Sequence, residues 1–269
     1  MSFLDRLKSI FKSKPKPIEP VRVPASTPTP RPLPKPPTNH DIGAKKLWIP
    51  FAVQGAKMRA RGSYPKNYPY GSVIHFTSGR WLGGLDKAFD TIEGGIVNGF
   101  LYMCISYDGK LIQTNPLNEW GYNAGESGWS KFSKLIKGTV SDELIGIEQN
   151  CAGKVKKLKD GRYETWFNTF LTEDEVRYVT EKEYGCPTGY YHKLSRDQEL
   201  TLTKTLLWLK ANNPDVFDLD LVVAHHEVAG TLGIGYFRKD DVGGSLSMSM
   251  KDYRAYLKAE YKKEYGVSV

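Results

Sequence analysis

Cysteine is scarce in this sequence, which holds 3 cysteines among 269 residues. Cys104, Cys151 and Cys186 are odd in number and show no CxxC spacing, so they lack the pattern of a disulfide framework or of a cysteine-based zinc site. We expect buried free thiols, because unpaired cysteine behaves as a small apolar residue. A Cys151–Cys186 bridge is the alternative in an oxidising compartment.

Long apolar runs are also absent. No stretch approaches the roughly 20 apolar residues of a membrane-spanning helix, and the N-terminus lacks the apolar region and small-residue cleavage site of a secretory signal. We therefore expect synthesis in the cytoplasm, with release by other means if the protein acts outside.

The net charge of +8 is concentrated in a short part of the chain. Residues 1–40 carry eight Lys or Arg against two acidic residues, a net +6, which leaves +2 for residues 41–269. The rest of the chain is close to neutral, so no nucleic-acid partner is expected.

The first 40 residues divide into two segments. Residues 1–14 place apolar side chains at helical spacing opposite basic ones, which predicts a basic amphipathic helix. It would dock to an anionic membrane or a protein partner, or else be a frayed, solvated tail. Residues 15–40 are proline-rich and predict an extended linker, so that the N-terminal extension is disordered and the folded domain covers residues 41–269.

Within residues 41–269, apolar runs alternate with helical patterns. This alternation predicts an α/β fold with a mixed central β-sheet flanked by helices. Residues 154–165 carry mixed charge and are expected to form a surface excursion. The expected strands are 71–76, 101–105, 111–114, 143–150 and 221–224; the expected helices are 81–98 (a short helix or loop), one opening at Ser195, and 250–264.

Two of the expected strands end on histidine. His75 follows one β-branched run, and His225-His226 follow another, before a glycine-rich loop that leads to Asp240-Asp241. Two imidazoles and one carboxylate leave the fourth position of a zinc ion free for water, as in catalytic zinc sites. If the histidine pair is extended, alternation allows only one of its members to face the metal.

Several motifs in about residues 70–245 carry a resemblance. They are Val-Ile-His-Phe-Thr (73–77), a hairpin at 103–113, Trp-Gly-Tyr-Asn-Ala-Gly-Glu-Ser-Gly-Trp (120–129), Ile-Gly-Ile-Glu-Gln-Asn (145–150), Ala-His-His-Glu-Val-Ala (224–229) and Arg-Lys-Asp-Asp-Val-Gly (238–243). In this order they resemble the zinc-dependent N-acetylmuramoyl-L-alanine amidases of the type 2 amidase and peptidoglycan-recognition family, which includes many phage lysins.

The resemblance implies a role for each matching residue. His75, His225 and Asp241 would bind Zn²⁺. Glu148 would activate the attacking water, Lys239 would stabilise the oxyanion, and Asn123 and Ser127 would contact the substrate.

Three positions depart from the family pattern. Asn123 stands where the family commonly has histidine. Leu101 occupies the place of a catalytic tyrosine found in some members, and strand alternation would point the neighbouring Tyr102 to the opposite face. Val242 replaces a proline, which should loosen the loop without removing a ligand. Leu101 in the place of the tyrosine favours the branch of the family that uses Glu148.

The resemblance thus implies a peptidoglycan hydrolase that cleaves the amide bond between N-acetylmuramic acid and L-alanine with a zinc-activated water. We expect a phage endolysin that acts at the bacterial cell wall or in the periplasm. The alternatives are a cytoplasmic muropeptide-recycling amidase and a non-catalytic peptidoglycan-binding or virion structural module of the same fold.

Overall fold

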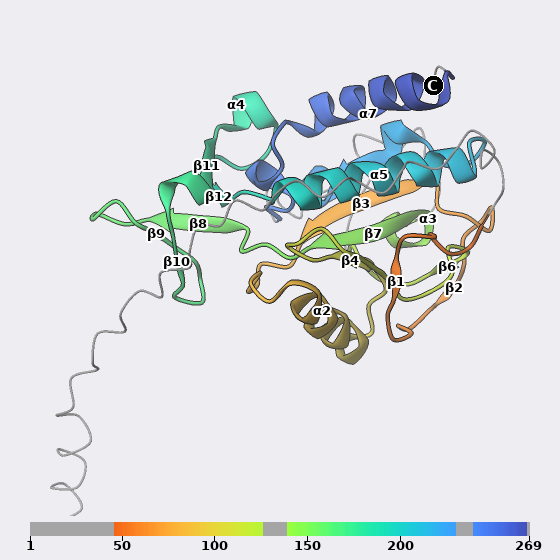
Figure 1. The fold of residues 1–269 in the computed structure, drawn as a ribbon, viewed down its shortest axis with the longest axis horizontal. Helices are drawn as coiled ribbons and strands as arrows, with labels where there is room; N and C mark the ends of the chain where they lie inside the picture. Colours follow the sequence, from red (N-terminus) through yellow and green to blue (C-terminus); the bar gives the residue numbers. More distant parts are fainter. Residues whose placement is uncertain (1–45, 126–138, 230–238, 268–269) are drawn as a thin grey trace, which may run out of the picture. The chain divides into compact units, whose positions relative to one another are not determined.

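A six-stranded sheet lies at the centre of the computed structural model, which describes residues 46–125, 139–229 and 239–267 (Figure 1). Its order is β1-β5-β4-β7-β3-β13, and every neighbouring pair is parallel except β4 and β5. The strands are β1 (Val53–Gln54), β3 (Gly71–Phe76), β4 (Met103–Ile105), β5 (Leu111–Gln113), β7 (Leu144–Gln149) and β13 (Val222–Ala224).

The central strands are apolar because helices cover both faces of the sheet. Helices α5 (Arg196–Asn212) and α7 (Met250–Tyr265) cover one face, and α2 (Gly84–Asn98) covers the other (Figure 1). Parallel strands that are buried on both sides give continuous apolar runs rather than alternation, which is why the sequence revealed them. The predicted mixed α/β fold class is confirmed.

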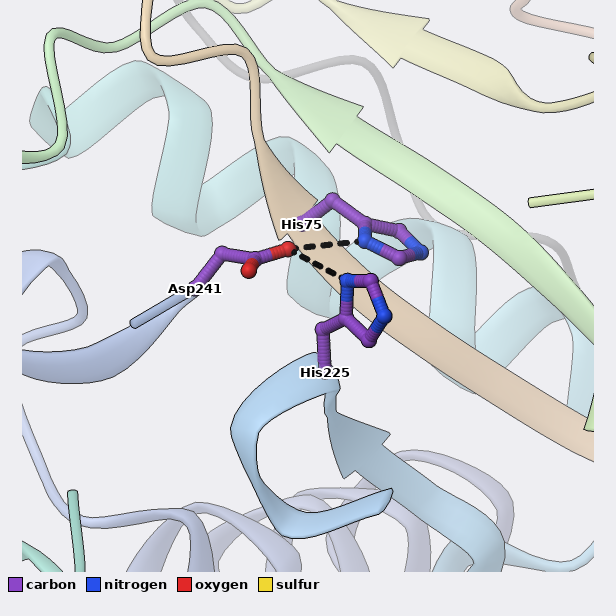
Figure 2. Close-up of side chains that lie close together, drawn as sticks. All are labelled: His75, His225 and Asp241. Atoms are coloured by element: carbon purple, nitrogen blue, oxygen red, sulfur yellow. Dashed lines mark hydrogen bonds and ion pairs between the residues drawn. The ribbon is translucent and has the colours of Figure 1, made fainter. Parts of the chain in front are cut away.

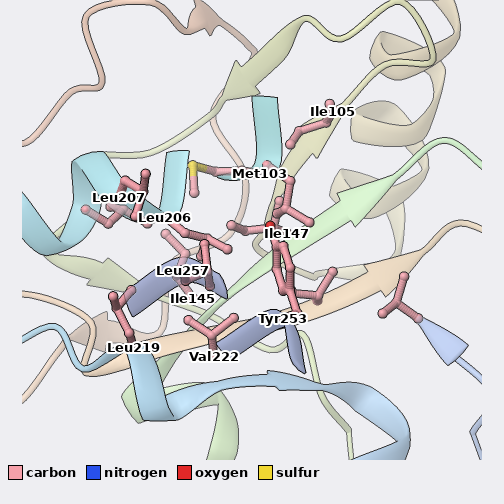
Figure 3. Packing of buried hydrophobic residues seen from close by; sticks show 14 of the residues in the cluster. Met103, Ile105, Ile145, Ile147, Leu206, Leu207, Leu219, Val222, Tyr253 and Leu257 are labelled. Carbon is pink, nitrogen blue, oxygen red and sulfur yellow. The ribbon is translucent and has the colours of Figure 1, made fainter. Parts of the chain in front are cut away.

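The main core fills the space between the sheet and the helices α5 and α7. Figure 3 shows side chains of β4 and β7, such as Met103 and Ile147, packed with Leu206 of α5 and Leu257 of α7. Ile147, Leu206 and Leu257 have no exposed surface. Burial of this kind stabilises a fold by about 1.5–3 kcal/mol for each such side chain.

Helix α5 begins where the sequence predicts. Its first turn has a capping box: the Ser195 Oγ accepts from the Gln198 N–H at 3.1 Å, and the Gln198 Oε1 accepts from the Ser195 N–H at 3.0 Å. The Gln198 Nε2 also donates to the carbonyls of Ile105 and Asn150, at 3.3 and 3.0 Å. These bonds attach α5 to the carboxyl ends of β4 and β7.

A second sheet of five antiparallel strands corrects the expectation that residues 154–165 are a surface excursion. Val155 and Tyr163 are buried in it. The strands of this sheet are only two to four residues long, and in Lys154–Lys157 three lysines surround Val155. No apolar run therefore indicated a strand here. The order is β10-β9-β8-β12-β11, formed by β8 (Lys154–Lys157), β9 (Tyr163–Glu164), β10 (Phe170–Leu171), β11 (Val176–Val179) and β12 (Gly189–His192).

The remaining elements are short. A strand pair joins β2 (Gly62–Ser63) to β6 (Glu119–Trp120), and the other elements are α3 (Val140–Glu143), η2 (Glu173–Glu175), α4 (Glu181–Tyr184), η3 (Leu219–Leu221), α6 (His225–Val228) and η4 (Gly243–Ser245). Cys104, Cys151 and Cys186 are buried and free, as expected.

The predicted helix 1–14 and linker 15–40 lie outside the described residues. Within 46–125, 139–229 and 239–267, every helix is too short or too polar to cross a membrane.

Candidate metal centre

Predicted site residues meet at the carboxyl ends of neighbouring strands of the central sheet. His75 of β3 and Glu148 of β7 are register partners on adjacent parallel strands. Ala224 of β13 is paired with Ile74, so His225 follows directly beside His75. Paired residues point to the same face of a sheet. The carboxyl ends of parallel strands are a common position for functional sites in α/β proteins.

His75, His225 and Asp241 converge on one point from three separate segments (Figure 2). The Asp241 Oδ2 lies 2.8 Å from the His75 Nδ1 and 3.0 Å from the His225 Nδ1. The two imidazole rings meet edge to face at 4.6 Å between centroids. All three side chains are buried, and their ligand atoms lie within 4.8 Å of one another, so they could hold a metal ion.

The donor set fits a metal because of the proton arrangement on His225. Its Nε2 lies 3.0 Å from the Ala124 carbonyl. A carbonyl only accepts, so this nitrogen must carry a proton, and in the neutral form of the ring it is Nδ1 that turns its lone pair to the Asp241 carboxylate. A lone pair and a carboxylate that face each other repel unless a cation lies between them. Metal-binding histidines commonly donate from their other nitrogen in this way.

The spacing also suits a small divalent ion. Bonds of about 2.0–2.2 Å in a tetrahedral site separate the ligand atoms by about 3.3–3.6 Å. The observed separations of 2.8 and 3.0 Å need to widen only slightly.

Burial and charge act together on the acidic groups of the site. Burial alone would raise the pKa of Asp241, but the adjacent His225 and His75 hold it well below its usual range. Burial and the Asp241 carboxylate raise the pKa of Glu148 to about 8, whereas the Lys239 ammonium opposes this rise. Burial also lowers the pKa of His75, which favours the neutral, ligating form of its ring.

A pocket of about 420 Å³ opens over these groups. Glu148, Asn123 and Lys239 line it together with the three metal-ligand candidates. Among the described residues, the Glu148 Oε2 and the Asn123 Oδ1 are buried without a hydrogen-bond partner. Ser127 lies outside the described residues, so its predicted substrate contact stays a prediction.

Tyr102 corrects one expectation. It lines the pocket instead of pointing away from it, and its hydroxyl donates to the Thr91 carbonyl of α2 at 2.9 Å. Strand alternation does not apply to this residue, because β4 begins only at Met103.

The histidine pair corrects another. His225 and His226 open the short helix α6 and are not extended, so helical rotation separates their side chains. His226 is buried, and its backbone N–H donates to the Asp241 carbonyl at 2.8 Å. Asp240 also lines the pocket but is not part of the ligand group, and its Oδ1 lies 3.5 Å from the Lys154 Nζ.

Ala124 is the site residue that the sequence did not reveal. It contributes through its backbone carbonyl, which any residue type would supply. Only its place in the glycine-rich motif 120–129 could have suggested a role.

Comparisons with known proteins give fold neighbours only. No family model and no curated protein matches the sequence. Similar solved structures include AmpD, with 17% identity, a TM-score of 0.48 and coverage of 78% of this chain and 96% of that chain. The N-acetylmuramyl-L-alanine amidase AmiD from E. coli, in complex with an anhydro-muramyl peptide substrate, has 17% identity and a TM-score of 0.43, covering 79% and 62%. The Clostridium intestinale endolysin amidase LysCS has 14% identity and a TM-score of 0.41, covering 82% and 99%.

Proposed function

We propose that this chain is a zinc-dependent amidase that hydrolyses the bond between N-acetylmuramic acid and L-alanine in peptidoglycan. One observation carries the proposal: His75, His225 and Asp241 converge beside the carboxylate of Glu148 in a single pocket. The motifs that contain these residues supply the substrate class, since they resemble those of the amidase family and follow in the same order.

Zinc is the metal that suits this donor set. Two imidazole nitrogens and one carboxylate oxygen are typical of catalytic zinc sites, which keep a further position open. When bound, zinc would lower the pKa of a water molecule and polarise the amide carbonyl.

In this proposal Glu148 moves the proton. Its carboxylate lies on the same face of the sheet as His75, in the neighbouring strand. It would accept a proton from the attacking water and return it to the nitrogen of the departing L-alanine. The pKa of this carboxyl is raised to about 8 by burial and by Asp241, and Lys239 counteracts the rise. A bound cation would favour the ionised, proton-accepting form in the same way.

Lys239 and Ala124 have supporting roles. The Lys239 ammonium would offset the negative charge that develops on the carbonyl oxygen of the substrate. The Ala124 carbonyl fixes the His225 ring with its Nδ1 directed at Asp241.

The test is product analysis on purified sacculi with zinc-loaded full-length protein. Mass spectrometry should detect free lactyl groups on muramic acid together with new L-alanine amino termini. Cleavage within the glycan strand or between stem-peptide residues would contradict the proposal.

The ligand assignment is tested separately by metal content. His225→Ala should lose bound zinc and activity, whereas His226→Ala should retain zinc, because the His226 ring faces the Asp241 carbonyl and not the carboxylate. The reverse result would mean that His226, and not His225, is the metal ligand.

For the biological role we propose a phage endolysin. The basic amphipathic pattern of residues 1–14 and the proline-rich linker 15–40 support this role, because a recycling enzyme needs no tether. Deletion of residues 1–40 should reduce binding to anionic vesicles and cell lysis while leaving turnover of a soluble muropeptide intact. Unchanged vesicle binding and lysis would exclude docking by this segment.

A further inference from the structure

Trp166 is the most exposed aromatic side chain among the described residues, at 73%. It lies in the turn between β9 and β10, a segment of the second sheet that the proposed mechanism does not use. The turn is well defined: the Thr165 N–H donates to the Thr169 carbonyl at 2.9 Å, and the Asn168 N–H donates to the Thr165 carbonyl at 3.1 Å. Asn168 has a positive φ of 59°, a conformation that asparagine tolerates better than most residues.

The exposed indole is held in one orientation. Its Nε1–H donates to the carbonyl of Ser78. Its ring meets the Phe167 ring edge to face at 5.4 Å between centroids. Phe167 in turn contacts Trp81 at 6.2 Å, and the Arg80 guanidinium lies 5.8 Å from the Phe167 centroid. These contacts fasten the hairpin tip to residues 78–81.

Ser78, the first residue of this segment, also forms part of the wall of the candidate active site. Ser78 lines the same pocket as His75, which it follows by three residues. The Trp166 indole is therefore attached to the rim of the pocket. A side chain that is already immobile loses little conformational entropy when it binds a ligand.

We propose that Trp166 is a platform for a sugar ring of the glycan strand whose muramic acid occupies the pocket. This inference rests on the proposed function. A pyranose ring presents C–H groups on its face and hydroxyls on its edge. The negative face of an indole attracts the weakly positive C–H groups, while the sugar hydroxyls remain in water. The exposed Arg80 adds hydrogen-bond donors near this platform.

The position of Trp166 explains why the occupant would be the glycan. The substrate is a polymer, so sugars on either side of the cleaved muramic acid must cross the rim of the pocket. One exposed ring such as Trp166 can contact a narrow, polar chain, whereas a broad protein surface needs a larger apolar contact.

The first experiment compares two soluble substrates with the same stem peptide. One carries a single muramic acid and the other carries a tetrasaccharide. We expect Trp166→Ala to raise KM for the tetrasaccharide by about tenfold and to leave turnover of the single-sugar substrate unchanged. Trp166→Phe should keep KM for the tetrasaccharide close to that of the native chain. Equal effects of Trp166→Ala on both substrates, or no effect on either, would overturn the proposal.

Tyr178→Ala is the matched control. Tyr178 of β11 belongs to the same sheet and is 54% exposed, but its ring contact is with Tyr190 of the adjacent strand rather than with a residue of the pocket wall. It should behave like the native chain with both substrates. A tetrasaccharide-specific loss as large as that of Trp166→Ala would show that exposed aromatic area in general, not the position at the rim, is responsible.

A binding measurement separates this proposal from the proposed function. Calorimetric titration with a glycan oligosaccharide that lacks stem peptides needs no turnover. The native chain and Tyr178→Ala should bind it with equal affinity, and Trp166→Ala should bind it about tenfold more weakly. Failure to cleave any muropeptide, with this difference in affinity preserved, would refute the amidase assignment and keep the platform. Equal affinities of native and Trp166→Ala protein would refute the platform alone.

Discussion

The two sheets of this protein differ in how deeply they are buried and in which residues they carry. The six-stranded sheet is covered on both faces and holds His75 and Glu148 at the carboxyl ends of its strands, with His225 directly after β13. The five-stranded sheet is antiparallel and leaves Tyr178 and Phe170 partly exposed. Reactive groups need fixed positions, which a buried parallel sheet supplies. The glycan contact that we propose for Trp166 needs exposed area, which the second sheet supplies.

The largest effect is expected from Asp241→Ala, which tests whether the group at the carboxyl ends of the central sheet binds the metal. Because the Asp241 Oδ2 faces both imidazoles, the variant should lose bound zinc and all detectable amidase activity. Metal analysis and sacculus turnover measure the two effects. Asp240→Ala is the control, since Asp240 faces Lys154, and it should retain zinc. Zinc loss in Asp240→Ala alone would mean that the neighbouring carboxylate is the ligand.

Glu148→Gln should separate metal binding from proton transfer. Removal of a general base typically lowers kcat by about 10²–10⁴-fold. The amide preserves the shape of the side chain, and Glu148 is not part of the three-residue ligand group, so zinc content should stay unchanged. Steady-state kinetics with metal analysis measures both. Full activity in Glu148→Gln would remove this residue from the mechanism.

His192 gives the second sheet a dependence on pH. The ring is fully buried in β12, its Nδ1 accepts from the Ala152 N–H at 3.1 Å, and burial lowers its pKa to about 4. In the unfolded chain the His192 ring takes up a proton near pH 6.5. The contribution of the neutral, buried ring to folding stability is therefore fully present above that pH and is lost as the pH falls towards 4. The loss should be roughly 2–4 kcal/mol.

Denaturant unfolding between pH 7 and pH 4 measures this loss. His192→Gln keeps an acceptor for the Ala152 N–H but cannot titrate, so its stability should depend less on pH. An equally steep dependence in both proteins would assign the acid sensitivity to other groups.

Ser195→Ala should have the smallest effect. It removes the N-cap of α5, the helix that covers the central sheet, and such caps contribute about 1 kcal/mol. Thermal or denaturant unfolding measures the change. Ser195→Asp, which also caps helices well, should restore most of the loss. A loss that Ser195→Asp does not reduce would point to the bond from the Ser195 Oγ to the Tyr107 carbonyl instead.

The same contrast explains what the sequence could predict. The strand Gly71–Phe76, the opening of α5 at Ser195 and the grouping of His75, His225 and Asp241 could be predicted from local runs, a cap and motifs. The second sheet rests on pairings between short lysine-containing strands, which no local pattern marks.

Within the site, the limits have the same origin. The Ala124 carbonyl acts through the backbone, Tyr102 lies just outside a strand, and the orientation of His226 follows from a helical turn. Each depends on tertiary placement rather than residue type.

The register between β3 and β7 has a consequence for how this chemistry can change. Neighbouring strands lie about 4.7–4.9 Å apart, and a slip of one residue turns every side chain to the opposite face. The separation between His75 and Glu148 is therefore fixed by the spacing and register of two adjacent strands. Loops around the pocket can vary in length while Glu148 keeps its distance from His75.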